Sequence, residues 1–314
     1  MLKKYRWHLE TFLFMTVSRC LARLPQGGAR SAGKWLGRFF FLLLKRRREV
    51  AVRNITESLP FLERQPGWVP RPARELARET FENLGRTVVE VCKLYHDRGA
   101  SLIESVEYHG REHFEAAMAR GKGVLMVTGH CGNWELMALS FGVRHQNVTI
   151  VAKRQENHYL NGVLEKVRER YGNSLIYREG ALRGMRAVFK NNGVVGLLID
   201  QASSPKDGVL VDFVGRPAWT NKVVATLARR AEVTVLPVFI HREGEKQVVE
   251  IQPMVVLEGE GEEPGELRDI QLMTRWVEEY VIKHPTEWYW IHQRWKRVPP
   301  QAARCEGAAV EDCC

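Results

Sequence analysis

The chain of 314 residues is 45% hydrophobic and carries a formal net charge of +10 at pH 7. A chain of this length can bury one sizeable core and still carry an appended segment. Its six cysteines include no pair with C-x2-C spacing, and three of them crowd at the C-terminal end. This pattern excludes a disulfide framework and a zinc site, and it fits a reducing cytosolic compartment.

The segment 1–53 carries the positive charge of the chain. It holds 13 Lys and Arg residues and two acidic ones, so its formal charge of +11 exceeds the +10 of the whole chain. Apolar stretches at 7–24 and 35–44 lie between these charges, which is typical of helices that lie on an anionic membrane. Neither stretch offers about 20 uninterrupted apolar residues, so a surface helix is favoured over a transmembrane span. The charge alone would also fit a nucleic-acid binder, but the apolar residues favour a membrane surface and no nucleic acid.

Further along the chain, an amphipathic helix is predicted over 70–96, and strands alternate with helices beyond residue 100. Apolar runs indicate strands at 123–128, 148–152, 174–177, 194–199, 209–214 and 233–240. Helical patterns occupy 112–120, 133–144, 157–171, 181–191, 221–231 and 266–283. The alternation predicts an α/β fold with a mixed, mainly parallel sheet flanked by helices.

The patterns divide the chain into three parts. We expect basic amphipathic membrane-associating helices over 1–53, an α/β domain over 54–300 and a disordered tail over 301–314. The alternative for the first part is that its helices only pack on the α/β domain. A stretch rich in Glu and Gly at 259–265 is expected to form a surface loop.

The most informative motif runs from His130 to Glu135, directly after the strand at 123–128. Five residues inside one helix would put the two side chains on different faces, so His130 is predicted on the turn and Glu135 in the first helical turn. The carboxylate can then hold one imidazole nitrogen and leave the other free to accept a proton from a hydroxyl. A structural histidine is the alternative. Cys131 is a weaker candidate nucleophile, because adjacent residues at a turn point in different directions.

The run from His130 to Glu135 resembles the H-x4-D/E motif of the glycerolipid acyltransferase superfamily, in the form typical of lipid A late acyltransferases. The similarity continues in the order of that family through Arg53-Asn54-Ile55 with Pro60, Asp200-Gln201, Phe213–Ala218, Leu227–Arg230, Leu236–Val238 and His284–Lys296. The resemblance implies an acyltransferase that needs no metal and no cofactor. It also implies that His130 is the general base and that Glu135 orients it.

Other candidate substrate-binding residues stand at strand ends, where α/β sheets bind ligands. Lys153 and Arg154 follow the strand at 148–152, and the resemblance implies a basic residue here that stabilises an oxyanion or binds phosphate. A solvated basic pair is the alternative. Asp200 follows the strand at 194–199 and is expected to bind the acceptor, to orient an Arg or Lys side chain in the site, or to cap a turn. Asn133 and Arg294, in the first and the closing motif, are also expected to bind substrate.

The resemblance implies transfer of an acyl chain from acyl carrier protein to a hydroxyl of a Kdo-bearing lipid A precursor, a step of lipopolysaccharide biosynthesis. Another membrane lipid, such as a lysophospholipid or a glycolipid, is the alternative acceptor, since the motif is shared by such enzymes. The reaction would take place at the cytoplasmic face of the bacterial inner membrane, with the protein bound peripherally or by a single pass. A metal hydrolase is disfavoured, because His130 and Glu135 lack a third ligand at a suitable spacing.

Overall fold

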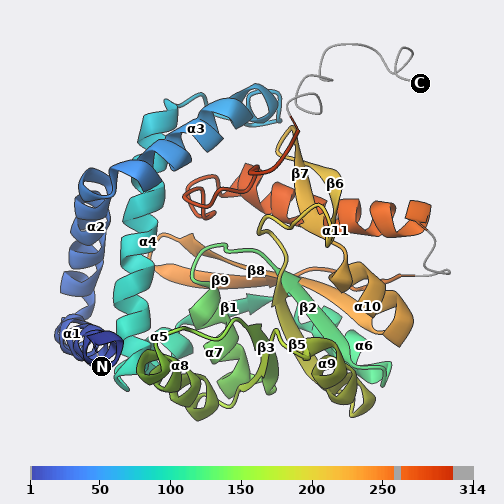
Figure 1. Cartoon of the computed structure of the whole chain (residues 1–314), viewed down its shortest axis with the longest axis horizontal. Coiled ribbons are helices and arrows are strands. Elements are labelled where there is room, and N and C mark those ends of the chain that lie inside the picture. The colour runs from blue at the N-terminus through green and yellow to red at the C-terminus, as the bar shows by residue number, and fades with distance from the viewer. Residues whose placement is uncertain (1, 258–262, 300–314) are drawn as a thin grey trace.

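The computed structural model describes residues 2–257 and 263–299, and four long helices precede its central sheet (Figure 1). They are α1 (Leu2–Ala22), α2 (Gln26–Leu43), α3 (Lys45–Leu62) and α4 (Ala73–Tyr95). The backbones of α2 and α4 lie in direct contact, because glycines face each other across the two helices. A Cβ added to Gly85 would stand only 2.1 Å from the carbonyl oxygen of Gly33. In the described part of the chain, no helix has both the length and the apolar character that crossing a bilayer requires.

The central sheet is mixed and mainly parallel, which confirms the predicted fold class. Its strands run in the order β1-β9-β8-β2-β5-β3-β4, and β10 pairs with β8. Only the pairs β8–β9 and β8–β10 are antiparallel among the described pairs of this sheet. The strands are β1 (Val106–His109), β2 (Val124–Thr128), β3 (Val148–Ala152), β4 (Ser174–Tyr177), β5 (Val194–Leu198), β8 (Thr234–Glu243), β9 (Lys246–Ile251) and β10 (Val255–Val256).

Helices cover both faces of the sheet (Figure 1). Side chains of α5 (Ala100–Glu104), α6 (Arg111–Ala119) and α7 (Trp134–Arg144) share one core cluster with alternate residues of β2, β3, β5 and β8. The other face packs against α9 (Ala181–Lys190), α10 (Val223–Ala231) and α11 (Glu263–Lys283). A separate hairpin of β6 (Gly208–Phe213) and β7 (Arg216–Asn221) lies beside α11, and α8 (His158–Arg170) lies between β3 and β4 in the chain.

The predicted strands and helices beyond residue 100 agree with the structure to within a few residues. The short helix α5 and the strands β1, β7, β9 and β10 were not predicted, since they are short or interrupted by polar residues. A domain boundary at residue 53 falls inside α3, and α11 begins at Glu263, so the predicted loop at 259–265 is helical at its end. The rest of that loop and the predicted tail at 301–314 lie outside the described residues.

Candidate active site

His130 and Asp200 meet at the carboxyl ends of two neighbouring parallel strands. The register of β2 and β5 pairs Thr128 with Leu198, and each chain continues two residues further, to His130 and to Asp200. The imidazole Nδ1 lies 2.8 Å from Oδ1 of Asp200, and the backbone N–H of His130 donates to Oδ2 at 2.8 Å. Trp288 Nε1 donates to the same Oδ2, also at 2.8 Å. Asp200 is therefore held by three donors in a buried position.

Electrostatic interactions within this pair favour the ionised form of Asp200 beside the imidazole of His130. Burial disfavours the charged form of Asp200, but the charge and hydrogen bonds of His130 and the bond from Trp288 outweigh it and lower the pKa of Asp200 to about 2. Burial also opposes protonation of His130, yet Asp200 outweighs it and raises the pKa of the imidazole above 6.5. An ionised Asp200 accepts the Nδ1–H of a neutral His130, which leaves the Nε2 lone pair available.

The Nε2 side of His130 faces the opening of the site. The side-chain amide nitrogen of Gln201 lies 3.2 Å from Nε2, and Gln201 itself is exposed. The rings of Trp134 and Tyr289 flank the imidazole, with centroids 5.1 and 5.7 Å away. A hydroxyl that replaces the exposed Gln201 amide can reach Nε2, so the arrangement suits a general base.

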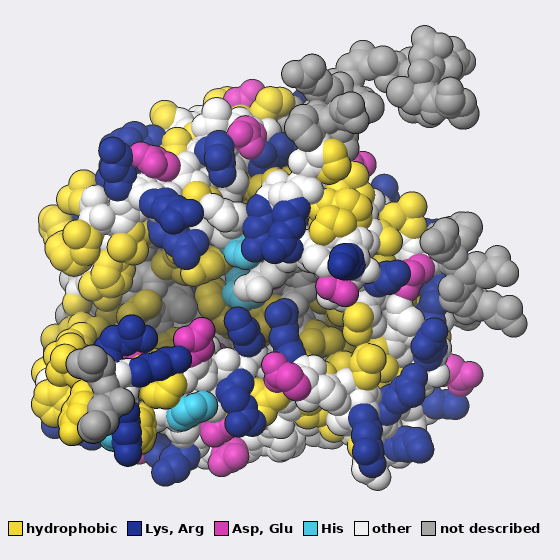
Figure 2. All heavy atoms as spheres, viewed as in Figure 1, with side chains coloured by type: hydrophobic (Ala, Val, Ile, Leu, Met, Phe, Trp, Pro, Cys, Tyr) yellow, Lys and Arg dark blue, Asp and Glu magenta, His cyan; other side chains and the backbone are white. Residues whose placement is uncertain are grey.

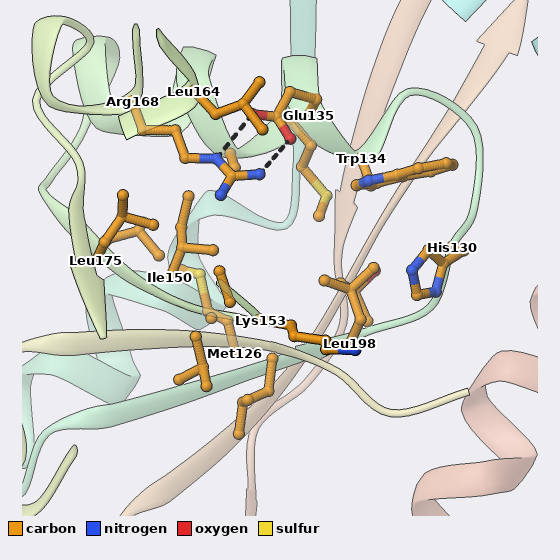
Figure 3. A pocket seen from close by; sticks show the side chains of 18 of the residues that line it. Met126, His130, Trp134, Glu135, Ile150, Lys153, Leu164, Arg168, Leu175 and Leu198 are labelled. Carbon is orange, nitrogen blue, oxygen red and sulfur yellow. Dashed lines mark hydrogen bonds and ion pairs between the residues drawn. The ribbon is translucent and has the colours of Figure 1, made fainter. Parts of the chain in front are cut away.

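The predicted contact between Glu135 and His130 is wrong. Both carboxylate oxygens of Glu135 instead accept hydrogen bonds from Arg168 of α8, at 3.0 Å each (Figure 3). The α7 helix begins at Trp134, so the side chain of Glu135 leaves its first turn toward α8. The five-residue spacing is compatible with either direction, and the ion pair with Arg168 together with the adjacent Asp200 decides between them.

A cavity of about 410 Å³ extends from His130 between the sheet and the helices α7 and α8. Figure 3 shows His130 at one end, the Glu135–Arg168 pair along one wall, and Ile150 and Leu175 at the far end. The lining is mostly apolar; from the sheet it includes Met126, Val148, Ile150, Leu175, Gly196, Leu198 and Val238, and from the helices Met137, Ala138, Phe141 and Leu164. Such a cavity suits a long apolar chain whose reactive end lies at His130.

The structure separates the two basic residues after β3. Lys153 lines the cavity (Figure 3), whereas the guanidinium of Arg154 lies 4.1 Å from the ring centre of Tyr177 and is not among the residues that line the cavity. Lys153 is therefore the one placed to meet a bound substrate.

Asn133 and Arg294 occupy structural positions, which corrects their prediction as substrate-binding residues. Asn133 is fully buried; its Oδ1 caps α7 by accepting the N–H of Leu136 at 3.0 Å, and its amide donates to Glu90 at 2.7 Å. Arg294 is 1% exposed and donates to the carbonyl oxygen of Trp219 at 2.6 Å. Both residues hold the elements that carry the site, and neither side chain is open to a ligand.

Sequence reasoning missed Arg168 and the bond from Trp288 to Asp200. A basic residue on the helix after a strand is too common to single out, but Trp288 lies inside the closing motif His284–Lys296, which was a usable signal. Cys131 is fully buried, and burial raises the pKa of its thiol well above 9.0, so it does not suit a nucleophile. Among the residues that the structure describes, no group of three His, Cys, Asp or Glu side chains could hold a metal ion.

Comparison with known proteins matches residues 2–297 to the family model described as bacterial lipid A biosynthesis acyltransferase. The chain is 24% identical to the lipid A biosynthesis lauroyltransferase of Escherichia coli K12, in an alignment of 294 residues that covers 92% of each chain. It is 26% identical over 235 residues to the phosphatidylinositol mannoside acyltransferase of Mycobacterium tuberculosis H37Rv, covering 73% of this chain and 72% of that one. A solved structure, the 1-acyl-sn-glycerophosphate acyltransferase PlsC of Thermotoga maritima, aligns with a TM-score of 0.37 and 18% identity over 73% of this chain and 97% of that chain.

Proposed function

Because the chain belongs to the bacterial lipid A biosynthesis acyltransferase family, we propose that it transfers an acyl chain from acyl carrier protein to a hydroxyl of a Kdo-bearing lipid A precursor. Its relatives are acyltransferases that act on lipids. The observation that carries the proposal is the His130–Asp200 pair at the mouth of an apolar cavity. A base at one end of a channel for an apolar chain is the arrangement that acyl transfer to a hydroxyl requires.

In the proposed reaction, the acceptor hydroxyl occupies the place of the Gln201 amide beside Nε2 of His130. Nε2 takes the hydroxyl proton as the oxygen attacks the thioester carbonyl, and Asp200 stabilises the imidazolium that forms. The tetrahedral intermediate then expels the thiolate of the carrier, and the imidazolium of His130 gives its proton to that thiolate. The products are an ester and a free thiol, so atoms and charge balance.

The cavity supports this assignment of donor and base. Its apolar walls can take up the acyl chain and exclude water, which limits loss of the thioester by hydrolysis. Lys153 lines the same cavity and can face the oxyanion of the intermediate or an acceptor phosphate. Glu135 contributes to the wall through Arg168 rather than to the base.

An exposed apolar surface on α1 and α2 supports a membrane-bound acceptor. Large apolar side chains are mostly exposed at Leu9, Phe12, Leu13 and Val17 of α1 and at Trp35, Phe39, Leu42 and Leu43 of α2. Figure 2 shows hydrophobic side chains along the outer edge formed by these helices, and Lys and Arg side chains around the hollow on the same face. Apolar residues beside basic ones suit contact with an anionic leaflet. We propose that this surface holds the protein at the cytoplasmic face of the inner membrane.

A second candidate acceptor is another membrane glycolipid. It is favoured by the 26% identity to an enzyme named for phosphatidylinositol mannoside, which is as high as the identity to the lauroyltransferase. The chemistry at His130 would be the same, because only the lipid that presents the hydroxyl differs.

The test is transfer by the purified full-length chain in mixed micelles. Lauroyl- or palmitoyl-loaded acyl carrier protein is mixed with a Kdo-bearing, tetra-acylated disaccharide or with phosphatidylinositol mannoside. The mass of the product lipid is then measured by mass spectrometry. Addition of one acyl group to the disaccharide supports the proposal, and addition only to the mannoside favours the second candidate. Absence of a new ester on either lipid, with the His130→Ala variant as blank, overturns both.

A further inference from the structure

One row of side chains crosses the sheet beneath the cavity. Neighbouring strands pair Leu236 with Met126, Met126 with Gly196, Gly196 with Ile150, and Ile150 with Leu175. Because paired residues on parallel strands point to the same face, these five positions form one continuous row. Four of them carry large apolar side chains, and the strand at the centre of the row, β5, contributes a glycine.

The backbone does not require this glycine. Gly196 is absent from the residues with positive φ, so any side chain could adopt its conformation. The heavy atom that a Cβ added there would approach most closely is Cγ1 of Val148, at 3.1 Å, a contact that a small shift of Val148 can relieve. Glycine inside a strand weakens it and often marks a place where a ligand comes close. The glycine at position 196 is therefore explained best by the space that the absence of a side chain leaves above the sheet.

That space is part of the cavity. Met126, Gly196, Ile150 and Leu175 all line it, and Figure 3 shows Met126, Ile150 and Leu175 on the side away from His130. The next row toward the site contains Thr128 and Leu198, so the Gly196 row lies two residues deeper, roughly 7 Å along the strands. An apolar chain that enters from His130 reaches the Gly196 row only if it is long.

We propose that Gly196 sets the length of the acyl chain that the enzyme accepts, by leaving open the part of the cavity between Met126 and Ile150. The inference rests on the proposed acyl transfer and names a residue that determines its donor specificity. A side chain at Gly196 would close the row and shorten the channel. Leu175, at the outer end of the same row, would bound the channel beyond it.

The test compares donors of different length on the wild type and on two variants that fill the row. Gly196→Ala and Gly196→Val are assayed for transfer from octanoyl-, lauroyl- and palmitoyl-loaded acyl carrier protein. We expect Gly196→Val to lower kcat/KM for the palmitoyl donor by about tenfold or more relative to the octanoyl donor, with Gly196→Ala between it and the wild type. Leu175→Ala should move the preference in the opposite direction, toward longer chains.

The matched control is Gly162→Ala, a helical glycine of α8 with no heavy atom near its Cβ position and no place in the cavity lining. It should leave the ratio between donors unchanged. Equal losses for all donors in the Gly196 variants, or an unchanged ratio, would overturn the inference. If Gly196→Val does not fold, the ratios for Gly196→Ala and Leu175→Ala must still move in opposite directions. A wild type that transfers none of the chains instead contradicts the proposed function itself.

Discussion

Asp200 accepts hydrogen bonds from the ring and the backbone of His130, and Glu135 pairs with Arg168. The two carboxylates thus have different tasks. One controls the protonation and orientation of the imidazole, and the other joins α7 to α8 beside the cavity. Substitutions of the two carboxylates should therefore separate loss of activity from loss of stability.

We expect His130→Ala to abolish transfer and Asp200→Asn to reduce kcat by about 10²-fold or more, since the base loses its orienting carboxylate. Glu135→Gln should leave the partly buried Arg168 without its counter-charge and destabilise the fold by at most about 3–5 kcal/mol, with a smaller loss of kcat. Turnover and thermal unfolding of the three purified variants measure both effects. A greater loss of kcat in Glu135→Gln than in Asp200→Asn would show that Glu135, and not Asp200, orients His130.

The dependence of kcat/KM on pH should reflect the titration of His130 beside Asp200. His130 must be neutral to accept a proton, so kcat/KM should fall as the pH drops below the imidazole pKa, which lies above 6.5. Since the charge of Asp200 raises that pKa, Asp200→Asn should move the acidic limb of the profile to lower pH while lowering the plateau. An acidic limb that stays in place in Asp200→Asn would show that another group controls it.

The two basic residues after β3 should also differ. Lys153 lines the cavity, so Lys153→Ala should lower kcat by about 10²–10³-fold if its ammonium faces the oxyanion or a phosphate. Arg154 packs on Tyr177, so Arg154→Ala should have a mild effect. Steady-state kinetics of both variants test this. Equal, small losses of kcat would show that the two residues are a solvated basic pair without contact to substrate.

At the scale of elements, the N-terminal helices combine a structural face with an exposed one. Ala29 and Phe41 of α2 are buried, and Gly33 and Gly37 of the same helix touch the backbone of α4. Removal of residues 1–51 would uncover this interface and cut α3, so truncation would test folding as well as membrane contact. Substitution of exposed side chains isolates the membrane contact.

We expect replacement of Leu9, Phe12 and Leu13 by Ser to weaken sedimentation with anionic liposomes, because these side chains are 57%, 65% and 51% exposed and free to enter the lipid interface. Lys45→Gln with Arg46→Gln should weaken it more at low than at high salt, at about 1 kcal/mol per charge. Leu267→Ser, an exposed apolar position on α11, is the control and should bind as the wild type does. Equal sedimentation of all these variants would exclude α1 and the start of α3 as the membrane contact.

Across the whole molecule, the apolar α1–α2 edge and the hollow bordered above and below by Lys and Arg side chains lie on one face (Figure 2). This arrangement would let a lipid acceptor reach the base from the membrane. The basic rim could meanwhile attract an acidic carrier protein. The acyl chain would lie inside the α/β core, in the cavity between the sheet and α7 and α8.

The sequence by itself determined the fold class, most strands and helices, the place of His130 after a buried strand and the likeness to an acyltransferase family. These features are local, because periodicity and short motifs depend on residues that are neighbours in the chain. Only the tertiary structure decided that Asp200 and not Glu135 meets His130, that Lys153 and not Arg154 lines the cavity, and that Gly196 interrupts a row of large side chains. Each of these depends on which strands are neighbours and in what register, and residues 70 apart in the chain, such as His130 and Asp200, meet only when β2 pairs with β5.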